Sequence, residues 1–366
     1  MNGTVDPRFT VETRADGTGV RGWPGRLADE LRALVAAGYP PGLALAVVDQ
    51  RGALLTAYGG FACVVDDSIP LERRTLFDLA SLTKVVATVP LALVLEERGR
   101  WRLTDPVAAW VPEFPRPDTT LWNLLTHTSG LVPHRAFYVT CPTPAAVREA
   151  VCAEGRESRP GGEVIYSDLN FMLLGWAIER CAGAPLGVLF RREIARPLGM
   201  QRSRFRPQPR QRRLCAATEL DGDQRTEPGL IWGIVHDGNA FALRGVAGHA
   251  GLFGPIDELA AFAGAFLNPV SHPVLSATSV TALSMRQAGR PPDVRSLGWR
   301  LDPEGWGDWP AGTYWHTGFT GTSILVAPAR GLAVVLLMNG VHPKRRPEAQ
   351  LEIRSRIHSI IAETCP

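Results

Sequence analysis

The chain has 366 residues, of which 45% are hydrophobic and 20% are charged, and its formal net charge is +3 at pH 7. This length and composition allow a large buried core and predict about two domains. The small net charge and the spread of the arginines exclude a basic nucleic-acid-binding face, and we interpret the densest arginine run, residues 202–213, as an exposed loop.

The N-terminal sequence and the cysteines bear on the compartment. Residues 1–23 are polar and lack a positively charged start followed by an apolar run, so no secretory signal is expected. The most apolar stretch, residues 85–97, is too short to span a bilayer and predicts a buried helix. The six cysteines show neither a CxxC pair nor a metal-ligand spacing. We therefore expect a cytoplasmic protein with reduced thiols, without a metal and without a membrane contact.

The hydrophobic pattern places strands near both ends of the chain and helices between them. The middle of the chain, about residues 81–290, is dominated by helical patterns broken by proline and glycine. The other predicted elements are a helix at 25–38, a hairpin at 42–60 turning at 49–52, a hairpin at 322–340 turning at 328–331, and a helix at 346–362.

These elements predict an α/β (α+β) fold. Strands from both chain ends are expected to pair in one antiparallel sheet flanked by helices, and the central helices to form a mainly helical lobe. The predicted domains are residues 1–80 together with 291–366, and residues 81–290. A functional site is expected in the cleft between them.

Lys84 is one of only two lysines among 39 basic residues. A buried lysine can lose its proton, whereas arginine cannot, so Lys84 is a candidate proton acceptor; the alternative is a solvated helix charge. Ser81 precedes it by three residues near a predicted helix start, which places both side chains on one face. Such a lysine can activate a serine hydroxyl, and the helix N–H groups can bind an oxyanion. Alone, the Ser-x-x-Lys spacing arises by chance about one time in ten.

Two further motifs follow in order. Tyr-Ser-Asp at residues 166–168 opens a predicted helix that ends near residue 183, and His-Thr-Gly at residues 316–318 begins the late hairpin. Together with Ser81 and Lys84, this order resembles the serine β-lactamase and penicillin-binding-protein superfamily. The resemblance is closest to its class C-like branch, with the family VIII esterases and D-alanyl-D-alanine carboxypeptidase relatives. It covers roughly residues 28–362 and includes the stretches 122–131, 196–200 and 245–262.

The resemblance implies a β-lactamase/transpeptidase-like fold and a site without a cofactor. It makes Ser81 the acylated nucleophile, Lys84 its base partner and Tyr166 the second proton carrier, with His316 contributing positive charge. The oxyanion hole would be the backbone N–H groups of Ser81 and Phe319. The expected substrate-binding residues are Asp168, Asn170, Thr317, Gly318, Trp306 and Trp309.

Two positions depart from the family pattern. Asp168 stands where many relatives have asparagine; when ionised it cannot donate to a substrate carbonyl, and it could hold Lys84 as an ammonium. Asn170 is nearby but out of register by two residues. His316 replaces a lysine and is charged only below a pKa of about 6.5 unless shifted. This favours ester or amide substrates lacking a carboxylate over efficient β-lactam hydrolysis.

Other prominent residues have structural alternatives. His127 and His249 are interpreted as turn or helix-start residues. Trp299, Trp306, Trp309 and Trp315 surround the approach to His316 in the sequence, and some are expected to pack on the sheet. Trp306 and Trp309, set among Gly, Asp and Pro, are expected either to pack or to line the substrate cleft.

Three functions remain open at the sequence level. The first is a serine hydrolase that cleaves a carboxylic ester or amide of a small molecule through an acyl-Ser81 intermediate. The second is a transacylase that passes the acyl group to an amine or alcohol. Both use the same acyl-enzyme, so the motifs do not separate them. The third is a non-catalytic binding module, which the intact Ser81, Lys84 and Tyr166 disfavour. A wall carboxypeptidase is a less favoured form of the first.

Overall fold

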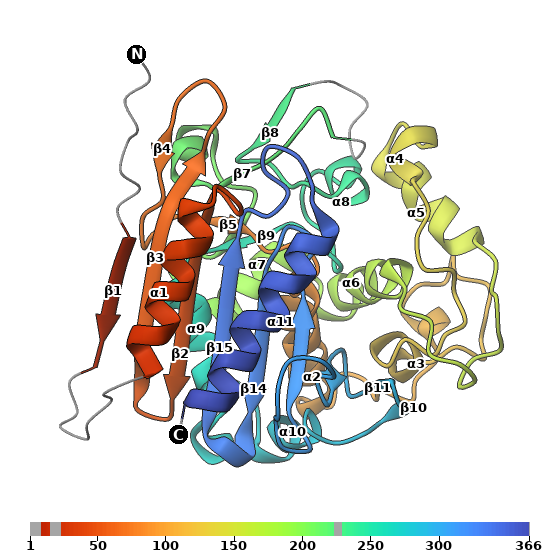
Figure 1. The fold of residues 1–366 in the computed structure, drawn as a ribbon. Helices are drawn as coiled ribbons and strands as arrows, with labels where there is room; N and C mark the ends of the chain where they lie inside the picture. Colours follow the sequence, from red (N-terminus) through yellow and green to blue (C-terminus); the bar gives the residue numbers. More distant parts are fainter. Residues whose placement is uncertain (1–8, 15–22, 223–228, 366) are drawn as a thin grey trace.

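The computed structural model describes residues 9–14, 23–222 and 229–365, and its centre is one antiparallel sheet (Figure 1). The strand order within the described residues is β1-β3-β2-β15-β14-β13-β12-β11-β10, and β4 pairs with β3. The strands are β1 (Phe9–Thr13), β2 (Gly42–Asp49), β3 (Gly52–Cys63), β4 (Ile69–Pro70), β10 (Ala288–Arg290), β11 (Asp293–Arg295), β12 (Arg300–Leu301), β13 (Tyr314–Thr317), β14 (Ser323–Ala327) and β15 (Leu332–Met338).

The two ends of the chain meet where β2 pairs with β15, with Leu45 opposite Leu336. This pairing confirms the predicted antiparallel sheet built from both ends. Both predicted hairpins are present, and the second turns through η6 (Pro328–Arg330) and Gly331, whose φ of 61° is a conformation that glycine adopts without strain. Strand β1 was not predicted. No secretory signal is expected in the N-terminal segment 1–23. Most of that segment, residues 1–8 and 15–22, lies outside the described residues.

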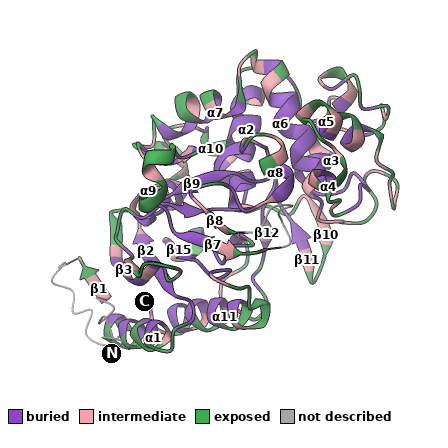
Figure 2. Cartoon of the chain, turned by 90° about the horizontal axis from the view of Figure 1, so that it is seen from above, coloured by how far each residue is buried: buried purple, intermediate pink, exposed green. Residues whose placement is uncertain are grey.

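Helices cover both faces of the sheet. Leu45 and Leu336 point to one face and pack against α1 (Trp23–Ala36) and α11 (Pro347–Thr364). Their neighbours Ala46 and Val335 point to the other face, because side chains alternate along a strand, and join the cluster that contains α9 (Ile256–Ala265). Figures 1 and 2 show α1 and α11 on one side of the sheet and α9 and α2 on the other.

The segment between the two sheet portions is mainly helical, but it is not wholly separate from the sheet, because α9 packs on β2 and β15. The arginine run expected to be a loop contains two short elements, β6 and η4, with Arg206, Arg210, Arg212 and Arg213 exposed. The elements of this segment are β5 (Phe77–Asp78), η1 (Lys84–Thr88), α2 (Val89–Glu97), η2 (Val107–Ala109), α3 (Leu121–Leu125), α4 (Phe137–Thr140), α5 (Pro144–Ala153), α6 (Asp168–Ala182), α7 (Leu186–Leu189), η3 (Phe190–Ala195), β6 (Arg204–Phe205), η4 (Pro209–Leu214), β7 (Ala217–Leu220), β8 (Leu230–Trp232), α8 (Gly238–Ala242), β9 (Leu252–Gly254), η5 (Pro269–Ser271) and α10 (Ala277–Ala282).

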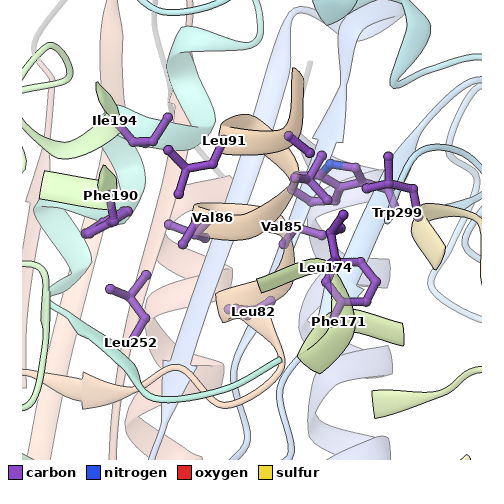
Figure 3. Close-up of a cluster of buried hydrophobic side chains, with 14 of the residues drawn as sticks. Leu82, Val85, Val86, Leu91, Phe171, Leu174, Phe190, Ile194, Leu252 and Trp299 are labelled. Carbon is purple, nitrogen blue, oxygen red and sulfur yellow. The ribbon is translucent and has the colours of Figure 1, made fainter. Parts of the chain in front are cut away.

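A buried apolar cluster anchors the helical segment that follows Ser81. Figure 3 shows Leu82 and Val85 of this segment on the side of Phe171 of α6 and Trp299, and Val86 on the opposite side, toward Phe190. The predicted helix is present, but its turn η1, from Lys84 to Thr88, has π-helical geometry, and α2 continues from it. A π turn is a local deviation that occurs often at functional sites. The cluster holds this turn, and therefore Lys84, in one place.

Within the described part of the chain, no single helix is long and apolar enough to cross a membrane. One pair, α6 with the segment Leu186–Ala195, meets the length and composition requirement jointly but is bent by 72°. All six cysteines are free thiols.

The central sheet position gives a stability prediction. Replacing Leu336 by alanine opens a cavity between β15 and the helices α1 and α11, and we expect it to lower the free energy of unfolding by about 2–5 kcal/mol in a urea titration. Leu351→Ala, at a leucine that is 61% exposed, is the matched control and should change it by less than about 0.5 kcal/mol. Equal effects of the two substitutions would contradict the assigned core.

Candidate active site

Ser81 lies where β5 ends and the helical segment begins. Ala80, just before it, has a φ of 46°, which is unusual for a residue with a Cβ, and its N–H donates to Asp78 at 2.9 Å. The hydroxyl of Thr320 donates to the carbonyl of Asp78 at 2.7 Å, so the loop after β13 is tied to this turn. The strained turn is held from both sides and presents Ser81 at the start of the helix.

Lys84 joins the predicted motifs. Its side chain is fully buried, and its Nζ lies 2.9 Å from Ser81 Oγ and 2.8 Å from Tyr166 Oη. Nζ also lies 2.8 Å from Asp168 Oδ1 and 3.4 Å from the carbonyl oxygen of His249. The structure therefore brings the Ser-x-x-Lys and Tyr-Ser-Asp motifs into direct contact around one amino group.

The carboxylate of Asp168 sets the charge of Lys84. Burial is the largest single influence and disfavours the ammonium, but the charges and hydrogen bonds of Asp168 and Tyr166 together outweigh it, and the pKa of Lys84 is raised above its ordinary value. In return, although burial opposes it, Lys84 holds the pKa of Asp168 far below its usual range. The resting Lys84 is an ammonium, as the aspartate in the second motif suggested. It can accept a proton only after the Lys84–Tyr166 pair has lost one.

Tyr166 lies between two cations. Lys84 Nζ is 4.9 Å from the centre of its ring, and the guanidinium carbon of Arg295 is 5.3 Å from the ring centre. The ring of His316 lies 5.9 Å away, but burial first, and then the charges of Lys84 and Arg295, hold the pKa of His316 well below 6.5. His316 is neutral here, so the expectation that it adds positive charge is corrected: Arg295 is the second cation.

The end of β13 and the loop that follows it lie against the backbone of Asp78 and Leu79, just before Ser81. Within the described residues, no backbone hydrogen bond uses the N–H of Ser81 or of Phe319 as donor. Gly318 makes the approach possible, since a Cβ there would lie 2.5 Å from the carbonyl oxygen of Leu79. The Phe319 ring is 37% exposed and lies between the ring of His236, at 5.3 Å, and the guanidinium of Arg345, at 3.9 Å.

Asp168 also contacts His134, a residue that the sequence did not single out. His134 Nδ1 lies 3.5 Å from Asp168 Oδ2, and its side chain is 40% exposed. The hydrogen bond with Asp168 raises the pKa of His134. The two oxygens of one carboxylate thus connect the buried Lys84 to a histidine that reaches solvent.

Three predicted substrate-binding residues lie elsewhere. Asn170 is fully buried and bonds with Ser129 and with His127 Nδ1, the latter at 3.2 Å. Trp306 belongs to the core between the sheet and α1 and α11, where it stacks on His358 at 4.2 Å. Trp309 packs against the same core, and its indole N–H donates to the Trp306 carbonyl. The expectations for Trp306 and Trp309 are corrected, because both side chains pack in the core beside α1 and α11. Asn170 instead uses its buried amide to bind Ser129 and His127, and so is not open to a substrate.

The two histidines singled out in the sequence, His127 and His249, and Thr317 of the third motif lie near the site. His127 accepts the Ser167 N–H at 3.1 Å, and His249 Nε2 lies 2.9 Å from Asp237 Oδ1, so both hold local structure as expected. Thr317 is half-buried, and its carbonyl oxygen lies 2.8 Å from His316 Nδ1. The residues that sequence reasoning missed, Arg295 and His134, belong to no motif, and only the fold brings them to Tyr166 and Asp168.

Comparisons with known proteins agree with this geometry. The Beta-lactamase family model matches residues 27–356. A putative D-alanyl-D-alanine carboxypeptidase of Escherichia coli K12 is 30% identical over 361 residues, covering 86% of this chain and 82% of the relative. An N-acetylmuramyl-L-alanine amidase of Bacillus subtilis is 30% identical over 353 residues, covering 84% and 79%. Among solved structures, EstCE1, described as a hydrolase with promiscuous acyltransferase activity, superposes with a TM-score of 0.75 at 20% identity, covering 92% of this chain and 98% of that one.

The Asp168 contact predicts a shift in pH dependence. In Asp168→Asn the negative charge that raises the pKa of Lys84 is gone, so the Lys84–Tyr166 pair should lose its proton more readily. We expect the acid limb of the pH–rate profile for ester acylation to move to lower pH. Removing one partner of the buried pair should also cost about 3–5 kcal/mol of stability, seen as a lower Tm.

Asp118→Asn is the control, since Asp118 is 58% exposed in its pair with Arg156. It should leave the profile and the Tm unchanged. An acid limb that stays in place, or moves to higher pH, in Asp168→Asn would contradict the assigned charge coupling.

Proposed function

The chain belongs to the β-lactamase family, and on that premise we propose that it hydrolyses a carboxylic ester or amide of a small molecule through an acyl-enzyme at Ser81. The observation that supports the proposal is the buried amino group of Lys84 within hydrogen-bond distance of both Ser81 Oγ and Tyr166 Oη. Nucleophilic catalysis by serine requires a base within hydrogen-bond distance of the hydroxyl, and the buried Lys84, linked to Tyr166, meets this requirement.

In the proposed acylation, Ser81 Oγ attacks the carbonyl carbon while its proton moves to the Lys84–Tyr166 pair. The pair accepts this proton only in the form that has already lost one proton, counted from a lysine ammonium and a tyrosine phenol. Because the two groups share a hydrogen bond, the proton is assigned to the pair and not to either group alone. The N–H groups of Ser81 and Phe319 receive the oxyanion. As the tetrahedral intermediate collapses, the bond to the leaving group breaks and Tyr166 returns the proton to it.

In the proposed second half, water attacks the acyl carbonyl carbon. The Lys84–Tyr166 pair takes the proton of the attacking water and gives one to Ser81 Oγ as the ester bond breaks. Hydrolysis thus regenerates the free serine, and the chain's own residues account for every proton.

The third motif bears on the substrate. The His316 side chain is buried, its Nε2 has no hydrogen-bond partner among the described residues, and its ring is neutral. A neutral, covered histidine offers no fixed cation to a substrate carboxylate, unlike a lysine at this position. We therefore propose ester or amide substrates that lack a carboxylate beside the scissile bond. This separates the proposed substrate class from that named for the carboxypeptidase relative.

Acyl transfer to an amine or alcohol is the second candidate. It needs the same acyl-enzyme and replaces water by another nucleophile. The structural similarity to EstCE1, described as having promiscuous acyltransferase activity, supports testing it alongside hydrolysis.

The central test is intact-protein mass spectrometry after mixing with 4-nitrophenyl acetate. We expect wild type to gain one acetyl group, Ser81→Ala to gain none, and Lys84→Arg to react at least about 100-fold more slowly, because an arginine cannot act in a proton relay. Lys344→Arg, at the other lysine of the chain, is the matched control and should react like wild type.

The fate of the acetyl group then separates the two candidates. Its loss at a rate independent of added amine or alcohol supports hydrolysis, whereas faster loss with transfer product supports the transacylase. Full activity of Lys84→Arg, or no acyl group on wild type with any ester or amide tried, would overturn the proposed function.

A further inference from the structure

Arg295 is a buried cation beside the proposed proton-transfer pair. It lies at the end of β11, and its residue is only 2% exposed. Charged side chains are seldom buried to this extent unless they are paired, because removal from water disfavours the charge. The side chains around this guanidinium therefore indicate whether Arg295 only stabilises the fold or also affects the proton-transfer pair.

The partner of Arg295 balances its charge incompletely. Asp293 lies 2.7 Å from Arg295 Nε and 3.1 Å from Nη2. Asp293 is also 3.5 Å from Arg300, so one carboxylate serves two guanidinium groups. Nη1 of Arg295 is buried without a hydrogen-bond partner among the described residues. Arg295, Arg300 and Asp293 together carry one net positive charge, and within this group the guanidinium of Arg295 is the buried member, whose field is screened least by solvent.

That charge faces Tyr166. The guanidinium carbon of Arg295 is 5.3 Å from the ring centre, and Lys84 Nζ is 4.9 Å from it. In contrast, the ring of His316 is buried and neutral. Among the described residues, the charged or titratable side chains in contact with Tyr166 are those of Lys84, His127, His316 and Arg295; Arg300 interacts with it electrostatically, and Asp168 is bound to Lys84. Asp168 is the negative member of this set.

We propose that Arg295 is a positioning residue that supplies the fixed positive charge on which proton loss from the Lys84–Tyr166 pair depends. The proposal rests on the proposed acyl-enzyme function. Arg295 touches neither Ser81 nor the reacting atoms in the described contacts; it acts through Tyr166. A cation near the ring favours the proton-deficient form of the pair, which is the form that accepts the Ser81 proton. Because the histidine of the third motif is uncharged, the fixed positive charge near Tyr166 comes instead from Arg295 on β11.

Two substitutions at this pair are expected to act in opposite directions. Arg295→Met removes the positive charge, so the acid limb of the pH–rate profile for acylation should move to higher pH, and the rate constant at neutral pH should fall on the order of ten- to a hundredfold. Asp293→Asn removes the negative charge that offsets Arg295, so the limb should move to lower pH. Arg295→Lys keeps the charge and should return the limb toward the wild-type position.

Arg290→Met is the matched control, because it removes the same charge from the same hairpin at an exposed position. Solvent screens that charge, and the profile should not move. All variants are compared by circular dichroism and Tm at the pH of assay, with stopped-flow acylation by 4-nitrophenyl acetate as the kinetic measurement.

The outcomes distinguish the proposal from a structural role. If Arg295→Met and Asp293→Asn both lower the rate and leave the acid limb in place, Arg295 only holds the hairpin and the proposal is wrong. A limb that moves the same way in both variants also overturns it. If wild type forms no acyl-enzyme at all, the proposed function fails instead, whatever the variants show.

Discussion

The structure depends on keeping one ammonium group in the interior. Lys84 is fully buried, and an isolated charge there would be too costly to maintain. Asp168 Oδ1 lies 2.8 Å from Lys84 Nζ and balances its charge, which makes the buried lysine compatible with the fold. The same ion pair sets the chemistry, because it keeps the resting lysine protonated. The π turn, the apolar cluster around it and the first turn of α6 all serve to hold the two groups together.

The groups of the proposed site come from both the helical segment and the sheet. Ser81 and Lys84 come from the start of the helical segment, Asp168 from α6, and Phe319, whose N–H is proposed as the second donor to the oxyanion, from the loop after β13. Two hydroxyl contacts tie that loop to the turn before Ser81: Thr320 to Asp78, and Thr322 to Leu79. The sheet and the helices therefore share one rigid site, and neither supplies it alone.

The charges around Tyr166 show how a site can keep its electrostatics when a motif residue changes. A histidine in the third motif would weaken the local positive charge if it were the only source. Here it is buried and neutral, and the guanidinium of Arg295 occupies the neighbourhood of the ring from another strand. The second carboxylate oxygen of Asp168 contacts His134, whose side chain reaches solvent. Charged and titratable side chains outside the three motifs thus surround the site as well as those within them.

The sequence by itself determined the sheet built from both ends, the hairpins and their turns, and the helices at both termini, because these follow from local periodicity and turn residues. It also indicated the contact of Ser81 with Lys84, since three residues of helix bring two side chains together. It left open whether Trp306 and Trp309 pack or line the cleft, since the residues around an indole do not reveal which face of the sheet it packs against; in the structure both pack with the core beside α1 and α11. The roles of Arg295, His134 and Asn170 were decided by tertiary structure alone. A long-range contact and the burial that shifts a pKa arise only when distant segments fold against each other, and no local pattern records them.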